Sequence, residues 1–362
     1  MKKHKICKIL LVILAIFLCV AFYELLGICV AYKKQPEVSN TTKKETKNGS
    51  WNECSENTER AVIIEKNPEA LLQRVRLIKN AKKEIIFSTF AFQSDESGKL
   101  ILGALHDAAD RGVHIRLLVD GMESWIDMEG NPYFYGLSSH ENVEIKLYNK
   151  ANPLKPWKMM GRMHDKYLIA DGKRYILGGR NTYNYFLGDF PGHKNYDRDV
   201  LVVCDEPEKE NSVNQLSEYF ETIWNQEDSG YFHNNKKLAN RKSVKNAVLE
   251  LQNSYQKYFE ENKERICETD YTDETFETEK ITLVSNPIHT GSKEPVVWYQ
   301  LGELMKNAKN RVKIHTPYII CNDMMYNTLE EIAENVSDFS IMTNSVANNR
   351  NPFGSADYTK NR

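Results

Sequence analysis

Residues 162–181, RMHDKYLIADGKRYILGGRN, bring together side chains that suit phosphate chemistry. They follow the pattern His-x-Lys-x4-Asp-x6-Gly-Gly-x-Asn. Phosphodiester exchange without a metal needs a nucleophile, positive charge on the phosphoryl oxygens and an acid for the departing alcohol. The imidazole of His164 can act as the nucleophile, and the ammonium group of Lys166 and the amide of Asn181 can hold a phosphate. This segment is therefore the leading candidate for a catalytic site.

The same segment has the pattern of a β-hairpin. Two short β-favouring runs, residues 167–170 and 175–177, flank Asp171-Gly172, a dipeptide typical of two-residue turns. Such a turn would pair Ala170 with Lys173 and place His164 opposite Gly179. Because strand side chains alternate between faces, four residues would then share one face of the hairpin: His164, Lys166, Gly179 and Asn181. Since Gly179 has no side chain, the other three would surround a free spot that suits a phosphate. The alternative is a charged, solvent-exposed hairpin without a catalytic role.

This string resembles the HKD motif of the phospholipase D superfamily, whose members include phospholipases, phosphatidyltransferases such as cardiolipin synthases, and nucleases. Further similarity extends from about Ala61 and includes residues 80–92, 112–121 and 197–199. The motif identifies the superfamily and separates its members poorly. The resemblance implies an α/β, phospholipase D-like fold of two similar halves, each with a mixed β-sheet flanked by helices.

The resemblance also implies roles for the residues of the motif. His164 corresponds to the nucleophile that forms a phosphohistidine intermediate. Lys166 and Asn181 correspond to the residues that hold the phosphate, beside Gly179. In the family, the two motifs meet between the halves, and the second histidine protonates the leaving group.

Two carboxylates complete the expected site. Asp171 corresponds to a residue that organises the site more than it reacts. Asp199 resembles the carboxylate that orients the nucleophilic imidazole in several members, which agrees with the need to select one tautomer of a catalytic histidine. Asp197 is a nearby competitor for that role.

No metal or other cofactor is expected. The seven cysteines are scattered, and no Cys-x-x-Cys or Cys/His cluster has the spacing of a metal site. The sequence also lacks a P-loop, a GxGxxG, an HExxH and a GxSxG motif.

Residues 1–34 differ from the rest of the chain. Four lysines precede a mostly apolar run at 9–32, which Glu24 interrupts and two further lysines follow. Those 24 residues would form a helix of about 36 Å, long enough to cross a bilayer. We expect a single-pass anchor in the cell membrane, with the body extracytoplasmic because the N-terminus is rich in lysine. A cleaved signal peptide with its apolar region at 9–23 is the alternative.

The charge of the body does not indicate a nucleic-acid partner. Six of the 48 Lys and Arg residues and one of the 50 Asp and Glu residues lie in 1–34, which leaves 42 basic and 49 acidic residues. A body near −7 is not typical of nucleic-acid binders that use a basic patch, although a local basic groove stays an alternative. Residues 152–160, NPLKPWKMM, suit a lipid headgroup boundary, or else form a loop that packs Trp157 on the body.

We expect four segments along the chain: the anchor at 1–34, a flexible polar stalk at 35–58, a first half with the HKD motif at 59–280 and an incomplete second half at 281–362. In the first half, the pattern predicts a parallel βαβ unit. Its elements are helices at 68–82 and 98–111 and strands at 84–92 and 114–120. Residues 207–265 should be largely helical.

An internal repeat supports the two halves. LIKNAKKEIIFSTFAF at 77–92 and LMKNAKNRVKIHTPYI at 304–319 align without a gap, at an offset of about 227 residues. The same offset places the second catalytic histidine near position 391, beyond Arg362. We therefore expect a truncated second half, little turnover by the monomer, and completion of the site by a second copy or another second-half partner.

These observations favour a membrane-anchored phosphatidyltransferase or phospholipase of the cardiolipin-synthase-like branch that acts on phospholipid phosphodiesters. A membrane-anchored nuclease or other phosphodiesterase is one alternative. A non-catalytic, truncated chain that only binds lipid is another.

Overall fold

The computed structural model describes residues 2–31, 33, 36–49, 59–204 and 211–345. The chain divides into two compact units. Unit 1 comprises Met1–Lys34, Cys54–Leu283 and Ile288–Ser292, and unit 2 comprises Gln35–Glu53, Val284–Pro287 and Lys293–Arg362.

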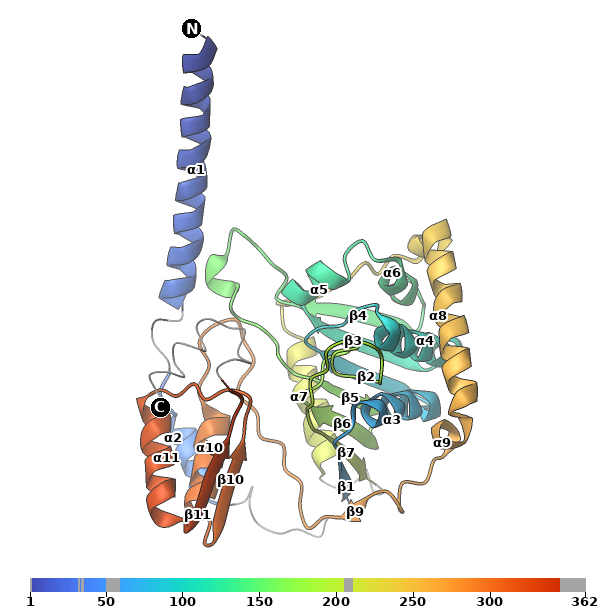
Figure 1. Ribbon diagram of the computed structural model, residues 1–362, viewed down its shortest axis with the longest axis vertical. Helices are drawn as coiled ribbons and strands as arrows, with labels where there is room; N and C mark the ends of the chain where they lie inside the picture. Colours follow the sequence, from blue (N-terminus) through green and yellow to red (C-terminus); the bar gives the residue numbers. More distant parts are fainter. Residues whose placement is uncertain (1, 32, 34–35, 50–58, 205–210, 346–362) are drawn as a thin grey trace. The chain divides into compact units, whose positions relative to one another are not determined.

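Unit 1 contains a nine-stranded mixed sheet with the order β8-β4-β3-β2-β5-β6-β7-β1-β9 (Figure 1). Its strands are β1 (Glu59–Ile64), β2 (Glu84–Thr89), β3 (His114–Asp120), β4 (Val143–Tyr148), β5 (Tyr167–Ala170), β6 (Arg174–Gly178), β7 (Asp199–Cys204), β8 (Ser229–Tyr231) and β9 (Phe276–Glu277). Strands β2, β3 and β4 are parallel, and the other pairings in this sheet are antiparallel.

The expected βαβ unit is present. Helix α3 (Asn67–Asn80) precedes β2, and α4 (Glu96–Asp110) connects β2 to the parallel strand β3. The side chain of Asp95 accepts a hydrogen bond from the Gly98 N–H and caps the start of α4. Beyond its end, Gly112 has a φ of +88°, a left-handed conformation that glycine adopts without strain.

Strand side chains alternate between the two faces of the sheet. Helices cover both faces, so the side chains form two separate cores. Along β5, Leu168 and Ala170 belong to one core, and Tyr167 and Ile169 belong to the other. The first core packs against α3, α4, α6 (Pro132–Ser138), α8 (Lys242–Glu261) and α9 (Lys263–Cys267). The second packs against α7 (Ser212–Trp224). The remaining short helices are α5 (Gly121–Asp127), η1 (Pro156–Lys158) and η2 (Lys236–Asn240).

One edge of this sheet collects the segments that carry the motif. Strands β2, β3 and β4 end at this edge, and their antiparallel neighbours make β5 begin, β6 end and β7 begin there. We call this the site edge, formed by residues 90–92, 120–127, 149–166, 178–182 and 196–199. In open α/β sheets the carboxyl ends of parallel strands are the usual place for a ligand.

Unit 2 repeats the βαβ arrangement on a smaller scale. It contains α10 (Val296–Lys306), β10 (Arg311–His315), α11 (Asp323–Asn335) and β11 (Asp338–Met342), and β10 pairs with β11 in parallel. The first residues of β2 and β10, Glu84 and Arg311, are related by the offset found in the sequence. The predicted repeat of helix, strand, helix and strand is therefore confirmed.

The prediction of a flexible stalk is wrong for part of its length. Residues Asn40–Lys47 form helix α2, which Ser39 caps. The Glu294 carboxylate accepts hydrogen bonds from the Ser39 N–H at 2.8 Å and the Thr42 hydroxyl at 2.7 Å, which fixes α2 within unit 2. The rest of the stalk, at 50–58, lies outside the described residues.

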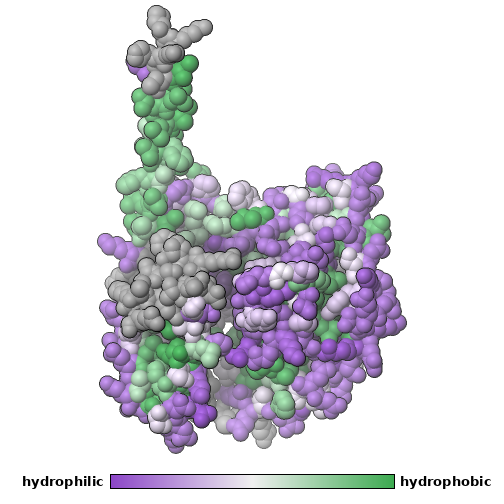
Figure 2. Space-filling view, in the orientation of Figure 1, coloured by the Kyte–Doolittle hydropathy of each residue, from purple (hydrophilic) through white to green (hydrophobic). Residues whose placement is uncertain are grey.

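The N-terminal helix α1 spans Lys2–Ala31. Within the described ranges, its segment Lys8–Ala31 is the one helix that is long and apolar enough to cross a membrane. Figure 2 shows the hydrophobic surface along this helix.

Candidate active site

The motif forms the hairpin β5–β6, but its register differs by one residue from the expected one. Ala170 pairs with Arg174 instead of Lys173. Asp171 and Gly172 are both left-handed, with φ of +54° and +61°, and the Lys173 N–H donates to the Ala170 carbonyl at 3.0 Å. Lys173 is the additional residue between the paired residues Ala170 and Arg174. The Gly178 N–H donates to the Lys166 carbonyl at 3.1 Å. The prediction that His164 lies opposite Gly179 is therefore wrong, and Gly178 takes the place beside Lys166.

Phe90, which follows β2, brings together three cationic or titratable side chains at the site edge. The His164 ring meets it edge-on, with 4.5 Å between ring centroids. Lys166 Nζ lies 5.3 Å and Arg162 Cζ lies 5.0 Å from the centroid of the same ring. Lys166 is buried, and its Nζ donates to the His164 carbonyl at 2.6 Å. The structure thus brings His164 and Lys166 together and adds Arg162, which sequence reasoning missed.

The charge states of these groups suit nucleophilic attack on a phosphate. Desolvation, followed by the positive charge of Lys166, lowers the pKa of His164 to about 4, although the side chain remains accessible to solvent. Burial lowers the pKa of Lys166 to about 8, against the opposing effect of nearby carboxylates. At neutral pH the imidazole is therefore unprotonated, while most of the ammonium groups keep their charge.

A second residue missed from the sequence is Asp120, the buried last residue of β3. Its carboxylate accepts hydrogen bonds from Arg162 Nε at 2.9 Å and from the Met163 N–H at 3.1 Å. It also acts electrostatically to raise the pKa of His164. Asp120 thus holds the backbone directly before the nucleophile candidate. Its place at the carboxyl end of a predicted parallel strand could have indicated it.

Asp165 connects the motif to α7, the helix that packs on the second core of the sheet. The Tyr219 hydroxyl, on α7, donates to Asp165 Oδ2 at 2.8 Å. The residue lies between His164 and Lys166 in the sequence, so this hydrogen bond restrains both neighbours. Nothing in the sequence pattern links Asp165 to Tyr219.

The two glycines of the motif make room for carboxylates. The Asp199 carboxylate fills the space that a Cβ on Gly178 would occupy, and the Asp197 carboxylate does the same at Gly179. The prediction that Gly179 leaves a free spot for a phosphate is therefore wrong for this structure. Asp197 is also one of the charges that raise the pKa of Lys166.

Asp199 has buried arginine partners. Its Oδ2 lies 2.9 Å from Arg74 Nη1 and 3.2 Å from Arg180 Nη1, and all three side chains are buried. Strand β6 lies between β7, which begins at Asp199, and β5, which His164 precedes. Among the described residues, the charged partners of Asp199 are therefore the two arginines. This finding corrects the expectation that Asp199 orients the His164 imidazole. The carboxylate instead offsets the charge of two arginines beneath the site.

Asp171 lies at the opposite end of β5 from His164. Its carboxylate accepts hydrogen bonds from the N–H groups of Lys82, Lys83 and Glu84, at 2.7–3.0 Å. These bonds fix the hairpin loop to the start of β2. At this position Asp171 can organise the hairpin, as expected, but it cannot react at His164.

Asn181 is buried at the site edge. Its Oδ1 accepts a hydrogen bond from the Ala91 N–H at 3.3 Å, so the side chain joins the ends of β6 and β2. The contact fixes which end of the amide is the oxygen, and the side chain also forms a hydrogen bond with Tyr183.

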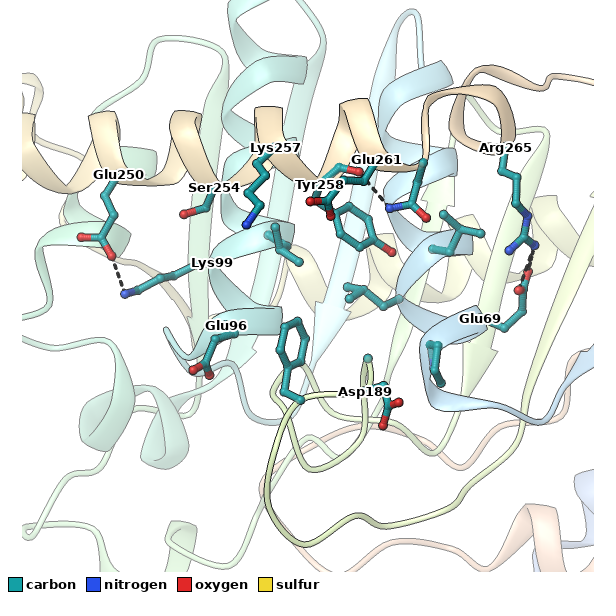
Figure 3. Close-up of a pocket in the computed structure, with 17 residues that line it drawn as sticks. Glu69, Glu96, Lys99, Asp189, Glu250, Ser254, Lys257, Tyr258, Glu261 and Arg265 are labelled. Atoms are coloured by element: carbon teal, nitrogen blue, oxygen red, sulfur yellow. Dashed lines mark hydrogen bonds and ion pairs between the residues drawn. The ribbon is translucent and has the colours of Figure 1, made fainter.

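A separate pocket of about 620 Å³ lies among α3, α4 and α8 (Figure 3). Two ion pairs flank it: Lys99–Glu250 at 2.6 Å and Arg265–Glu69 at 2.9 Å. The residues that line it do not include those of the motif. This pocket is therefore distinct from the site around His164.

Residues 74–224 match the family described as cardiolipin synthase, PLD-like domain. The chain is 27% identical over 317 residues to an uncharacterized protein of Helicobacter pylori, an alignment that covers 79% of this chain and 59% of that protein. It is 30% identical over 154 residues to cardiolipin synthase C of Escherichia coli, covering 39% of this chain and 31% of that protein. The chain thus spans less than two thirds of the length of these relatives.

The fold is similar to that of phosphatidylserine synthase from Haemophilus influenzae. The TM-score is 0.54 at 14% sequence identity, and the match covers 83% of this chain and 66% of that chain. At this identity the similarity concerns the fold.

Proposed function

We propose that this chain, a member of the cardiolipin-synthase-like branch of the phospholipase D superfamily, transfers or hydrolyses the phosphatidyl group of a membrane phospholipid through His164. The observation that carries the proposal is that His164 and Lys166 both contact the ring of Phe90, at a place where desolvation lowers the pKa of the imidazole to about 4.

In the first step, a lone pair on the His164 imidazole attacks the phosphorus atom. A nitrogen–phosphorus bond forms as the bond to the departing alcohol breaks, and the alcohol oxygen takes up a proton. The ammonium group of Lys166 and the amide of Asn181 stabilise the negative charge on the phosphoryl oxygens. In the second step, an acceptor alcohol or water attacks phosphorus, the nitrogen–phosphorus bond breaks, and the proton of the acceptor leaves.

The source of the leaving-group proton lies outside the motif around His164. The 362 residues contain one string of the form His-x-Lys-x4-Asp. We propose that a second HKD motif, on another copy of the chain, on a partner or on a continuation of this chain, supplies the acid.

The test is to trap the covalent intermediate. The purified chain is mixed with phosphatidylglycerol that carries a label in its phosphate and is stopped with alkali, because phosphohistidine is stable in base and labile in acid. Native protein and His193→Ala, which changes an exposed histidine, should retain the label, whereas His164→Ala should not. A labelled His164→Ala protein would refute the covalent role. Absence of label together with salt-sensitive DNA cleavage would favour the nuclease alternative.

We also propose that α1 anchors the chain with the body on the extracytoplasmic side. Its length and apolar surface support this arrangement. The exposed thiol of Cys267 allows a test with a membrane-impermeant maleimide on spheroplasts. We expect labelling before lysis, loss of this labelling in Cys267→Ser, and a protein mass that includes residue 1. Labelling only after lysis would contradict the orientation, and a shortened N-terminus would favour the signal peptide.

A further inference from the structure

Large hydrophobic side chains are exposed on two segments of the site edge. On α5, Trp125 and Ile126 are 67% and 66% exposed. In the loop between β4 and β5, Leu154 is 77%, Met160 is 55% and Trp157 is 44% exposed. We call these five residues the apolar platform. The exposure of Trp157 also shows that this loop does not bury its tryptophan in the body.

The two segments of the platform are tied to the motif and to each other. Helix α5 begins directly after Asp120, and the loop includes His164 and ends where β5 begins, at Tyr167. Arg162 forms ion pairs with Asp120 at 2.7 Å and with Glu123 of α5 at 3.1 Å. Within the loop, Asn149 Nδ2 donates to the carbonyls of residues 158 and 161 at 2.7 and 2.8 Å. The platform therefore has a defined conformation beside the nucleophile candidate.

This clustering is particular to the site edge. Figure 2 shows hydrophobic side chains on the surface over α5 and η1. The other exposed large hydrophobic residues in the described body of unit 1 are scattered: Tyr196 lies on another segment of the site edge, and Ile63, Tyr231, Leu249 and Phe276 lie elsewhere. A contiguous exposed apolar surface beside a site indicates a partner that covers it.

The charge and the neighbours of the loop identify this partner as a lipid surface. Residues 149–164 contain four Lys and Arg residues and no Asp or Glu, although the body as a whole is acidic. The Tyr23 hydroxyl of α1 donates to the Leu154 carbonyl at 3.0 Å, and Pro156 packs closely against Gly27. Tyr23 and Gly27 belong to the last turns of a helix that is a few ångströms longer than the hydrocarbon core of about 30 Å. Tryptophan and lysine are the residues expected at the headgroup level there.

We propose that the apolar platform docks into the headgroup region of a bilayer that contains anionic phospholipid. Docking holds the site edge against the membrane, so that a headgroup reaches His164 while the acyl chains stay in the bilayer. The catalytic part of this inference rests on the proposed function, whereas docking itself can be measured without turnover.

The first experiment measures docking. The full chain is reconstituted into bilayers of phosphatidylethanolamine and phosphatidylglycerol, with or without bromine on the acyl carbons nearest the headgroups, and tryptophan fluorescence is recorded. Brominated lipid should quench the native chain. The double variant Trp125→Phe, Trp157→Phe should lose at least about half of that quenching, since it removes both tryptophans of the platform and keeps an aromatic ring at each position. Equal quenching of the native and double-variant chains would overturn the proposal.

The second experiment separates docking from chemistry. Trp125→Ser with Ile126→Ser should slow covalent labelling by bilayer phosphatidylglycerol about tenfold, through lost membrane affinity. It should leave labelling by dispersed, short-chain phosphatidylglycerol unchanged. Leu249→Ser, at a residue 57% exposed on α8, is the matched control and should change neither rate. Equal slowing with both lipids would overturn the proposal. Quenching without any labelling would refute the proposed function and leave docking intact.

Discussion

The carboxylate of Asp197 occupies the space in which a Cβ on Gly179 would stand. The same carboxylate raises the pKa of the buried Lys166. In this structure, Asp197 thus takes the position that the motif suggests for a phosphate. An incoming phosphate must displace this carboxylate or share the charge of Lys166 with it.

Asp197→Asn should move the alkaline limb of covalent labelling to lower pH. Removing the negative charge removes one of the effects that support the protonated form of Lys166, so its pKa should fall below its present value of about 8. Initial labelling rates between pH 6 and pH 9 measure the change. Asp189→Asn, at an exposed position, is the control and should keep the native profile. An unchanged profile in Asp197→Asn would contradict the electrostatic link to Lys166.

His164 should titrate well below the ordinary range of histidine. Protein NMR of the labelled imidazole should show a midpoint near pH 4, and the acid limb of labelling should follow it, because the group must be unprotonated to attack. Lys166→Met should raise the midpoint, since it removes the positive charge that opposes protonation. A midpoint near 6.5 in the native protein would contradict the described environment.

Asp199→Asn should act mainly on stability. Removing the negative charge leaves Arg74 and Arg180 buried without their partner, and breaking a buried pair in this way costs about 3–5 kcal/mol. Urea unfolding in detergent measures the loss, and Asp273→Asn, at an exposed position, should show none. If Asp199→Asn kept native stability but lost covalent labelling, this result would support a role for Asp199 in orienting the His164 imidazole.

Asp171→Ala should weaken the hairpin loop while sparing the chemistry. The variant loses three hydrogen bonds to the backbone at residues 82–84, and we expect a stability loss of about 1–3 kcal/mol. The labelling rate per folded molecule should stay within about threefold of native. Loss of labelling at native stability would show that Asp171 takes part in the reaction.

The monomer should label slowly and turn over little. A positioned acid typically contributes about 10²–10⁴-fold, and the chain supplies one HKD motif. Turnover of phosphatidylglycerol should therefore rise with oligomer content, measured by light scattering on the same samples. Rapid multiple turnover by a monomer would show that another residue of this chain protonates the leaving group.

Much of the scaffold follows from the sequence, because its signals are local. Alternating and helical apolar patterns predict the β2–α4–β3 unit and its repeat in β10–α11–β11, and each was found at the expected place. The spacing of His164 and Lys166 likewise places both residues directly before β5, where the structure brings them to the ring of Phe90.

Only the tertiary structure decides which groups surround that pair. Asp120 and Phe90 reach the motif because three parallel strands end at one edge, a relation between residues more than forty positions apart. Asp199 binds Arg74 across 125 positions, and one extra residue in the loop at Asp171 shifts the hairpin register. Sequence spacing gives the distance between residues along a strand. The burial, the ion pairs and the pKa of the site residues depend instead on the side chains that tertiary packing places around them.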